Sequence, residues 1–235
     1  MIGIIGAMAD EVNGLKAIME TVKVEKISSV EFFSGRICGI DAVVAEAGIG
    51  KVNAAITAQT MIMRYNTERI INIGVAGGLA PSLDIGDIVI ADKVCEHDMD
   101  TTACGDEAGY ISGLNRVYMD CDTETVNMLE RAAESLGIHH ITGTIASGDL
   151  FVSSDEQRTR IINTFSAAAA EMEGGAIGHV CTVNNVPFCV LRAISDSANS
   201  DSVVDFPAFA KKAAENSINI IKIFFGFEKG VNSNE

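Results

Sequence analysis

Short apolar runs alternate along the chain with longer stretches in which apolar residues recur every three or four positions. β-branched residues enrich the apolar runs, which lie at 1–5, 41–45, 69–73, 87–91, 140–146 and 187–194. Runs that are apolar at nearly every position predict strands covered on both faces. The helical period marks the stretches at 10–21, 51–64, 123–136, 173–184 and 206–225. Strands separated by helices indicate an α/β fold.

One segment near the start breaks this alternation. Two strand-like stretches, FFSGRI and DAVVAE, have only Cys38, Gly39 and Ile40 between them. A connection this short joins antiparallel strands, so we expect a hairpin and therefore a mixed sheet. We find no linker, repeat or low-complexity run. The sequence therefore predicts a single domain over 1–228 and a polar, frayed tail over 229–235.

Composition and charge narrow the class of protein. The 235 residues are 48% hydrophobic and 21% charged, which is typical of a globular protein. Seventeen basic and thirty-two acidic side chains give a net charge of −15 at pH 7. Such a surface repels nucleic acid and anionic lipid, so neither is an expected partner. The apolar N-terminal run lacks a preceding basic residue, and no uninterrupted apolar stretch reaches about 18 residues, so we expect neither a signal peptide nor a membrane span.

Cysteine and histidine usage bears on compartment and metal binding. The six cysteines are spread through apolar or mixed segments and form no CxxC pair. We therefore expect reduced, mostly buried thiols in a cytoplasmic protein. Zinc ligands usually come in closely spaced pairs, and only four histidines are present, so no metal site is predicted.

Glycines and carboxylates gather in the loops that follow the predicted strands. Ligands of open α/β sheets bind beyond the carboxyl ends of the strands. Because glycine lets a backbone approach a ligand closely, we interpret this rim as a small-molecule site, although any one of the loops would equally suit a simple turn. The spacing after Gly3 is not GxGxxG, and Gly48–Ile49–Gly50–Lys51 lacks the Walker spacing. Dinucleotide and P-loop sites are therefore disfavoured.

Eight segments together resemble the purine nucleosidase/phosphorylase superfamily. The resemblance is closest to the nucleosidases that act on 5'-methylthioadenosine and S-adenosylhomocysteine. It implies a nucleoside phosphorylase-like three-layer α/β/α sandwich with a central mixed β-sheet. It also implies a homodimer, no cofactor, and hydrolysis of the N-glycosidic bond to adenine. The segments span nearly the whole chain in order: GIIGAMADEV (3–12), AGIGKVNAA (47–55), NIGVAGGLAP (72–81), GDIVIADKV (86–94), HDMDTTACG (97–105), SGDLFV (147–152), AEMEGGAI (170–177) and VPFCVLRAISDSA (186–198).

Cleavage of a ribosyl–adenine bond needs an acid for the departing purine and a base for the attacking water. The resemblance implies that Asp196 protonates the purine at N7 and that Glu11 activates the water. A partly desolvated aspartic acid can keep its proton near neutral pH. Taken without the resemblance, an Asp after a strand equally suits a turn, and Glu11 in a first helical turn equally suits the helix dipole.

The resemblance also implies the contacts with the substrate. Glu173 would bind the ribose hydroxyls, and Arg192 would orient Glu173 and the water. Phe151 would stack on adenine, and the backbone of Val152 would read the edge of the base. Core packing or a structural ion pair is the alternative for several of these residues. The remaining predicted contacts come from Gly77, Met172, Ser195, Met8, Ile49 and Phe206.

Three positions depart from the superfamily pattern. Val75 stands where a serine is common, Cys104 where an aromatic residue is common and Ser112 where a proline is common. In the family the last two positions line the pocket for the 5' substituent, partly across the dimer interface. A wider or more polar 5' pocket is therefore expected here.

The first loop bears on the choice between hydrolase and phosphorylase. Asp10 and Glu11 would repel a phosphate dianion held beside them, so water is the expected nucleophile. The alternatives are a nucleosidase for another 5' substituent, such as the futalosine type, a purine nucleoside phosphorylase, and a nucleoside-binding protein without turnover.

Overall fold

The computed structural model describes the backbone of residues 1–196 and 206–232, and the side chains of 1–196 and 214–230. Over these residues the strands join in a single mixed sheet, flanked by helices. The strands are β1 Ile2–Gly6, β2 Glu20–Ile27, β3 Val30–Ile37, β4 Ile40–Glu46, β5 Arg69–Gly78, β6 Ile88–Glu96, β7 Tyr118–Asp120, β8 His140–Ser147, β9 Ala169–Glu171 and β10 Phe188–Asp196. The helices are α1 Ala9–Lys16, α2 Lys51–Tyr65, α3 Thr123–Ser135, α4 Asp155–Phe165, α5 Gly174–Asn184 and α6 Phe206–Asn232, with a short 3-10 helix at Thr102–Cys104.

Half of the sheet closes on itself. Its strand order is β10-β6-β8-β9-β5-β1-β4-β3-β2, and β10 also pairs with β5. Strands β5, β10, β6, β8 and β9 therefore form a closed ring, and β1, β4, β3 and β2 extend from it. Antiparallel pairs occur within both parts, among them β3 with β4 and β6 with β10. The mixed sheet expected from the early hairpin is confirmed.

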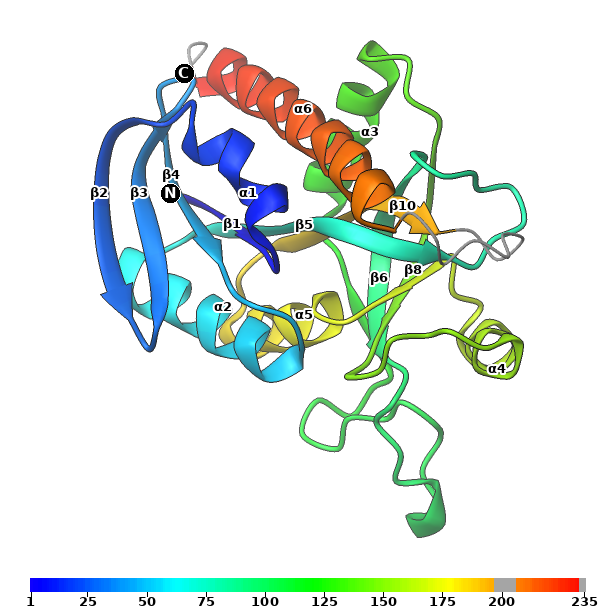
Figure 1. The fold of residues 1–235 in the computed structure, drawn as a ribbon. Coiled ribbons are helices and arrows are strands. Elements are labelled where there is room, and N and C mark those ends of the chain that lie inside the picture. Colours follow the sequence, from blue (N-terminus) through cyan, green and yellow to red (C-terminus); the bar gives the residue numbers. More distant parts are fainter. Residues whose placement is uncertain (197–205, 233–235) are drawn as a thin grey trace.

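Helices cover the two faces of the sheet. Figure 1 shows α1, α3 and α6 on one side and α2 with α5 on the other. Within the first layer α6 contacts both α1 and α3, and within the second layer α2 contacts α5. The predicted α/β/α arrangement is confirmed, and the carboxyl ends of β1, β4, β5, β8 and β10 lie at one rim.

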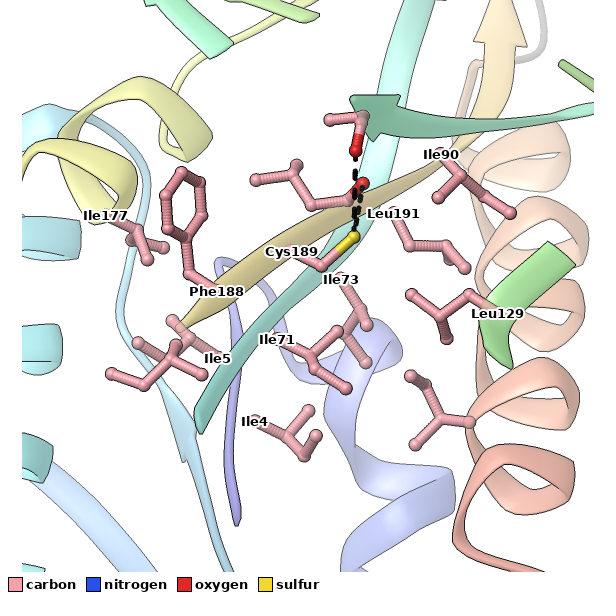
Figure 2. Packing of buried hydrophobic residues seen from close by; sticks show 14 of the residues in the cluster. Ile4, Ile5, Ile71, Ile73, Ile90, Leu129, Ile177, Phe188, Cys189 and Leu191 are labelled. Atoms are coloured by element: carbon pink, nitrogen blue, oxygen red, sulfur yellow. Dashed lines mark hydrogen bonds between the residues drawn. The ribbon is translucent and has the colours of Figure 1, made fainter. Parts of the chain in front are cut away.

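The core is built from the apolar strands and the inner faces of the helices. Figure 2 shows Cys189 of β10 among aliphatic side chains that include Ile71, Ile73 and Leu191. All four side chains are fully buried. The Cys189 thiol donates to backbone carbonyls, among them that of Ala91 at 3.8 Å. The core therefore runs continuously through the strands that carry the rim.

The structure corrects several boundaries. Helix α1 ends at Lys16, and part of the predicted helix over 10–21 belongs to β2. Strand β2 is an exposed edge strand with alternating charges, so its sequence lacks the apolar run of a buried strand. Helix α6 continues through Gly226 to Asn232, so the segment expected as a tail begins inside this helix. Helix α4 was not predicted. The single domain stays a prediction.

None of the described helices combines the length and hydropathy needed to cross a bilayer. Within the described part of the chain, no three side chains of the His, Cys, Asp and Glu types are arranged to hold a metal ion. Four of the six cysteines are buried, and Cys38 and Cys104 are exposed.

Candidate active site

A cavity of about 170 Å³ opens at the rim where the strands end. Its wall comes from the carboxyl-terminal ends of β5, β9 and β10 and from the segments that follow β1, β4, β8 and β9. The lining surface is mainly apolar, and Glu11, Glu171, Glu173 and Asp196 supply its carboxylates. The lining residues are Ala7, Met8, Glu11, Ile49, Val75, Ala76, Gly77, Leu150, Phe151, Val152, Ala170, Glu171, Met172, Glu173, Ser195 and Asp196.

Glu11 lies in the first turn of α1 with its carboxylate buried and fixed. One oxygen, Oε2, accepts hydrogen bonds from the backbone N–H groups of Ala7 at 2.6 Å and Met8 at 2.9 Å. The other, Oε1, accepts from the N–H of Val75 at 3.1 Å. Burial raises the pKa of Glu11, although Arg192 and these backbone donors oppose the increase. A carboxylate held this way, with a raised pKa, suits a general base.

Arg192 projects from β10 into the interior and is completely buried. Its Nη2 donates to Asn72 Oδ1 at 2.5 Å, to Glu171 and, at 3.4 Å, to Glu173 Oε2. A Cβ at Gly74 would lie 1.9 Å from Arg192 Nη1, so only glycine at this position leaves room for the guanidinium. A buried charge needs such partners, because removing it from water is costly.

Glu173 and Glu171 share this one guanidinium. Burial raises the pKa of Glu173 to about 7, with Arg192 lowering it and the Glu171 charge raising it further. Glu173 Oε1 accepts from the N–H of Gly50 at 2.9 Å, which ties this carboxylate to the start of α2. Glu173 therefore lies at the cavity wall with one oxygen toward α2 and the other toward Arg192.

Glu171 is a functional candidate that sequence reasoning missed. Its carboxylate accepts from Ser147 Oγ and from the backbone N–H groups of Glu173 at 3.0 Å and Gly174 at 2.8 Å. These bonds shape the turn that carries Met172 and Glu173 to the cavity. A possible sequence signal is the pair of carboxylates two residues apart directly after a strand, since a buried arginine needs a partner.

Asp196 ends β10 on another side of the cavity. Ser195 Oγ donates to its Oδ1 at 3.0 Å, and Arg158 Nη2 of α4 lies 3.9 Å from its Oδ2. A Cβ at Gly77 would lie 3.2 Å from Oδ2, so β5 approaches this carboxyl closely. The structure thus brings Glu11 and Asp196 to one cavity, as the sequence-based interpretation requires.

The family profile described as the phosphorylase superfamily matches residues 1–226. The chain belongs to the phosphorylase superfamily. Curated relatives in this superfamily include the 5'-methylthioadenosine/S-adenosylhomocysteine nucleosidase of Shewanella sediminis, 43% identical over 218 residues, which are 92% of this chain and 94% of the relative. The nucleosidase of the same name from Shewanella frigidimarina is 44% identical over 224 residues, 94% and 96% of the two chains. At this identity and coverage, the chain belongs to that nucleosidase family.

Solved superfamily structures have the same fold. A Neisseria meningitidis nucleosidase of this name, in complex with methylthio-immucillin-A, is 35% identical with a TM-score of 0.90, covering 95% of this chain and 97% of that one. A Colwellia psychrerythraea nucleosidase in complex with adenine is 36% identical with a TM-score of 0.91, covering 96% and 94%. A futalosine hydrolase of Helicobacter pylori is 32% identical with a TM-score of 0.89, covering 95% and 96%.

The predicted site residues of this superfamily member fall into three groups. Arg192 lies behind the wall against Glu173, and the side chain of Phe206 lies outside the described residues. Cys104 and Ser112 are exposed and do not line the cavity. They lie in the segment between β6 and β7, which extends away from the sheet in Figure 1. All other predicted site residues line the cavity: Met8, Glu11, Ile49, Gly77, Phe151, Val152, Met172, Glu173, Ser195 and Asp196.

Val75 also lines the cavity, so the departure at this position changes the wall itself. Its backbone N–H still binds Glu11, but its side chain offers no hydroxyl. Among the described lining residues none is a lysine or an arginine. A phosphate dianion in the cavity would meet Glu11 and Glu173 without a lining cation, which favours water as the nucleophile.

Proposed function

We propose that this protein hydrolyses the N-glycosidic bond of 5'-methylthioadenosine and S-adenosylhomocysteine. The observation that carries the proposal is the placement of Glu11, Glu173 and Asp196 around one cavity whose remaining wall is mainly apolar. Family membership and the names of the relatives support the same reaction. The products are adenine and the corresponding 5-thioribose.

In the proposed reaction, Asp196 gives a proton to N7 while the electron pair of the C1'–N9 bond moves to the purine. The sugar develops positive charge, which the carboxylate of Glu173 stabilises through the ribose hydroxyls. Water bonds to C1' and loses its proton to Glu11. Both carboxyl groups return to their starting state when Glu11 releases its proton to solvent and Asp196 takes one up from solvent.

The other cavity residues bind the substrate in this proposal. Phe151 stacks on adenine, the Val152 backbone reads the edge of the base, and Met172 packs on the sugar. Ser195 orients Asp196 through its 3.0 Å hydrogen bond, and Arg192 orients Glu173. Gly77, Met8 and Ile49 complete the wall.

Incubating the purified protein with methylthioadenosine and measuring adenine release tests the reaction. Phosphate should leave the rate unchanged, whereas a phosphorylase requires it. Futalosine belongs in the same substrate panel because a futalosine hydrolase is among the similar structures. Faster release from futalosine would favour that alternative, and tight nucleoside binding without any product would favour a non-catalytic binding protein.

Substitutions test the two proposed catalytic groups. Glu11→Gln and Asp196→Asn should each lower kcat by about 10²- to 10⁴-fold, because each removes one proton transfer. Steady-state kinetics and circular dichroism measure turnover and folding. Asp10→Asn is the control, since Asp10 is an exposed neighbour that lines no part of the cavity. Near wild-type turnover in either active-site variant would remove that residue from the mechanism.

We further propose a cytoplasmic homodimer that serves methionine salvage and the removal of a methyltransferase product. Helix α2 supports the dimer because Val52, Ile56 and Met63 are exposed apolar residues. At 100° per residue they lie within about 40° of one another on the helix. Such a face favours a partner surface. The partner would then supply Cys104 and Ser112 to the 5' pocket.

A further inference from the structure

Two cavity loops are joined by charged side chains outside the proposed catalytic groups. The first loop carries Ile49 into the cavity wall and leads into α2. The second follows β8 and contributes Leu150, Phe151 and Val152. Leu150 and Phe151 are exposed at 41% and 59%, and this loop has no helix or strand before α4. Burial of these side chains therefore does not fix its position.

Lys51, Asp98 and Asp149 form a closed ring of hydrogen bonds between the loops. Lys51 Nζ donates to Asp98 Oδ1 at 2.7 Å, and Asp98 Oδ2 accepts from the backbone N–H of Asp149 at 2.9 Å. Asp149 Oδ1 in turn accepts from the backbone N–H of Lys51 at 2.8 Å. The Asp149 carboxylate thus caps the N-terminus of α2 from another part of the chain, where a negative charge is favourable.

The lysine is anchored to β6 as well. Its Nζ lies 2.8 Å from Glu96 Oε2, and Glu96 Oε1 lies 3.0 Å from His179 Nδ1 of α5. Side-chain exposure of Lys51 is only 18%, and that of Glu96 is 11%. Burial acts to lower the pKa of Lys51, but the bonds to Asp98 and Glu96 outweigh it and raise the pKa, so the ammonium stays charged. Ion pairs shielded in this way are screened less than surface pairs.

The residue before Lys51 connects the ring to the ribose-binding candidate. The Gly50 N–H donates to Glu173 Oε1 at 2.9 Å. Gly50 has a φ of +99°, and a Cβ there would lie 3.0 Å from Asp149 Oδ1. A small shift of the α2 start would therefore move the amide that binds Glu173 and the loop that carries Phe151 together.

We propose that Lys51 is a positioning residue. Through Asp98 and Asp149 it holds the two cavity loops together and keeps the Gly50 amide within hydrogen-bonding distance of Glu173. This inference rests on the proposed function for its kinetic consequence. Lys51, Asp98 and Asp149 do not line the cavity, so they act by holding the residues of the cavity wall in place before the substrate binds.

Lys51→Met keeps an unbranched side chain only one heavy atom shorter and removes the charge. KM for methylthioadenosine should rise by about tenfold, because misplaced binding groups weaken substrate binding. We expect a smaller change in kcat, since Glu11 and Asp196 are held by separate contacts. Lys16→Met is the matched control: Lys16 is 16% exposed and pairs with Glu46, and neither residue lines the cavity. An unchanged KM in Lys51→Met, or an equal rise in both variants, would overturn the proposal.

A double-mutant cycle separates the ring from general destabilisation. If Lys51 acts through Asp98, the double variant Lys51→Met, Asp98→Asn should have a KM no higher than that of the single variant with the higher KM. Multiplied effects on KM would contradict the ring. The pH profile of kcat/KM adds a second readout. Because the Gly50 N–H lowers the pKa of Glu173, losing this bond should move the acidic limb to higher pH in Lys51→Met.

Hydrogen exchange tests the coupling without any substrate. In Lys51→Met, exchange should increase at 48–51 and at 147–152 together, and in Lys16→Met at neither. Increased exchange at only one of these segments would overturn the coupling. If the wild type releases no adenine while Lys51→Met shows the paired increase, the proposed function is refuted and the coupling through the ring stands. Sedimentation velocity on both variants ensures that equal oligomeric states are compared.

Discussion

Arg192 shows how individual residues set the chemistry of the cavity. One buried guanidinium faces the carboxylates of Glu11, Glu171 and Glu173. A single positive charge does not compensate three buried negative charges, so protonation of one carboxyl group is favoured. Burial raises the pKa of both Glu11 and Glu173, and the charges of Glu171 and Glu11 raise that of Glu173 further, while Arg192 opposes both increases. Glu173 therefore keeps its proton up to a pH close to neutral.

This proton makes stability depend on pH. Between the usual value of 4.5 and the raised pKa of about 7, folded Glu173 keeps a proton that the unfolded chain has released. The free energy of unfolding should therefore fall as pH rises through this window and level off above it. In Glu173→Gln the fall should be smaller, because only Glu11 then contributes in that direction. Urea unfolding at about pH 5 and about pH 7.5 measures the difference. Equal losses in the variant and the wild type would refute this origin.

At the residue scale, sequence reasoning located the cavity and missed part of its support. Glu11, Glu173 and Asp196 could be predicted because they follow strand ends in segments that resemble a known superfamily. Glu171 and Asn72 could not, because their roles depend on where Arg192 points. Each lies in a different element from Arg192, 21 and 120 residues away in sequence. Partners of this kind need the assembled sheet.

At the scale of elements, β10 connects the closed ring to the site. Leu191 pairs with Ile73 of β5 and with Ile90 of β6, and it is completely buried (Figure 2). The next residue is Arg192. Packing at Leu191 therefore holds the strand that supplies both Arg192 and Asp196.

Truncating Leu191 should destabilise the whole protein. We expect Leu191→Ala to lower the free energy of unfolding by about 2–5 kcal/mol, because it leaves a cavity in a dense core. Leu136→Ala is the matched control, since Leu136 is 39% exposed at the end of α3. Its cost should stay below about 1 kcal/mol in the same urea titration. Similar losses in the free energy of unfolding for the two variants would mean that packing at Leu191 does not stabilise the protein in this way.

The elements that the sequence predicted well are those with buried, apolar faces. Strands β1, β4, β8 and β10 agree with the apolar runs to within a few residues. Strand β2 was not predicted because an edge strand lacks that pattern, and its first two residues fell in the helix predicted over 10–21. Helix α4 was missed although Ser154 and Gln157 form a capping box, which is a readable start signal. Only Ile161 and Phe165 of this helix are buried, so its sequence lacks a strongly periodic apolar face.

At the scale of the whole molecule, the exposed face of α2 predicts self-association. Val52→Glu should place like charges against each other across the proposed interface and weaken the dimer by more than about tenfold, or about 1.4 kcal/mol. Sedimentation velocity over a concentration series measures this. Val24→Glu is the control, because Val24 is 54% exposed and belongs to the edge strand β2, not to the apolar face of α2. A dimer equally stable in both variants, or a monomeric wild type, would contradict the proposed interface.

The closed ring of β5, β10, β6, β8 and β9 also limits how chains can join by strand addition. Among the described strands, only β2 and the three-residue β7 have a single neighbour. Strand β2 alternates acidic and basic side chains, from Glu20 through Lys23 and Glu25 to Lys26. Charged edges of this kind disfavour pairing with another chain. Amyloid-type growth of the native protein would therefore have to start at the three-residue β7 or at the highly charged β2, and this architecture should disfavour aggregation of the folded enzyme by strand addition.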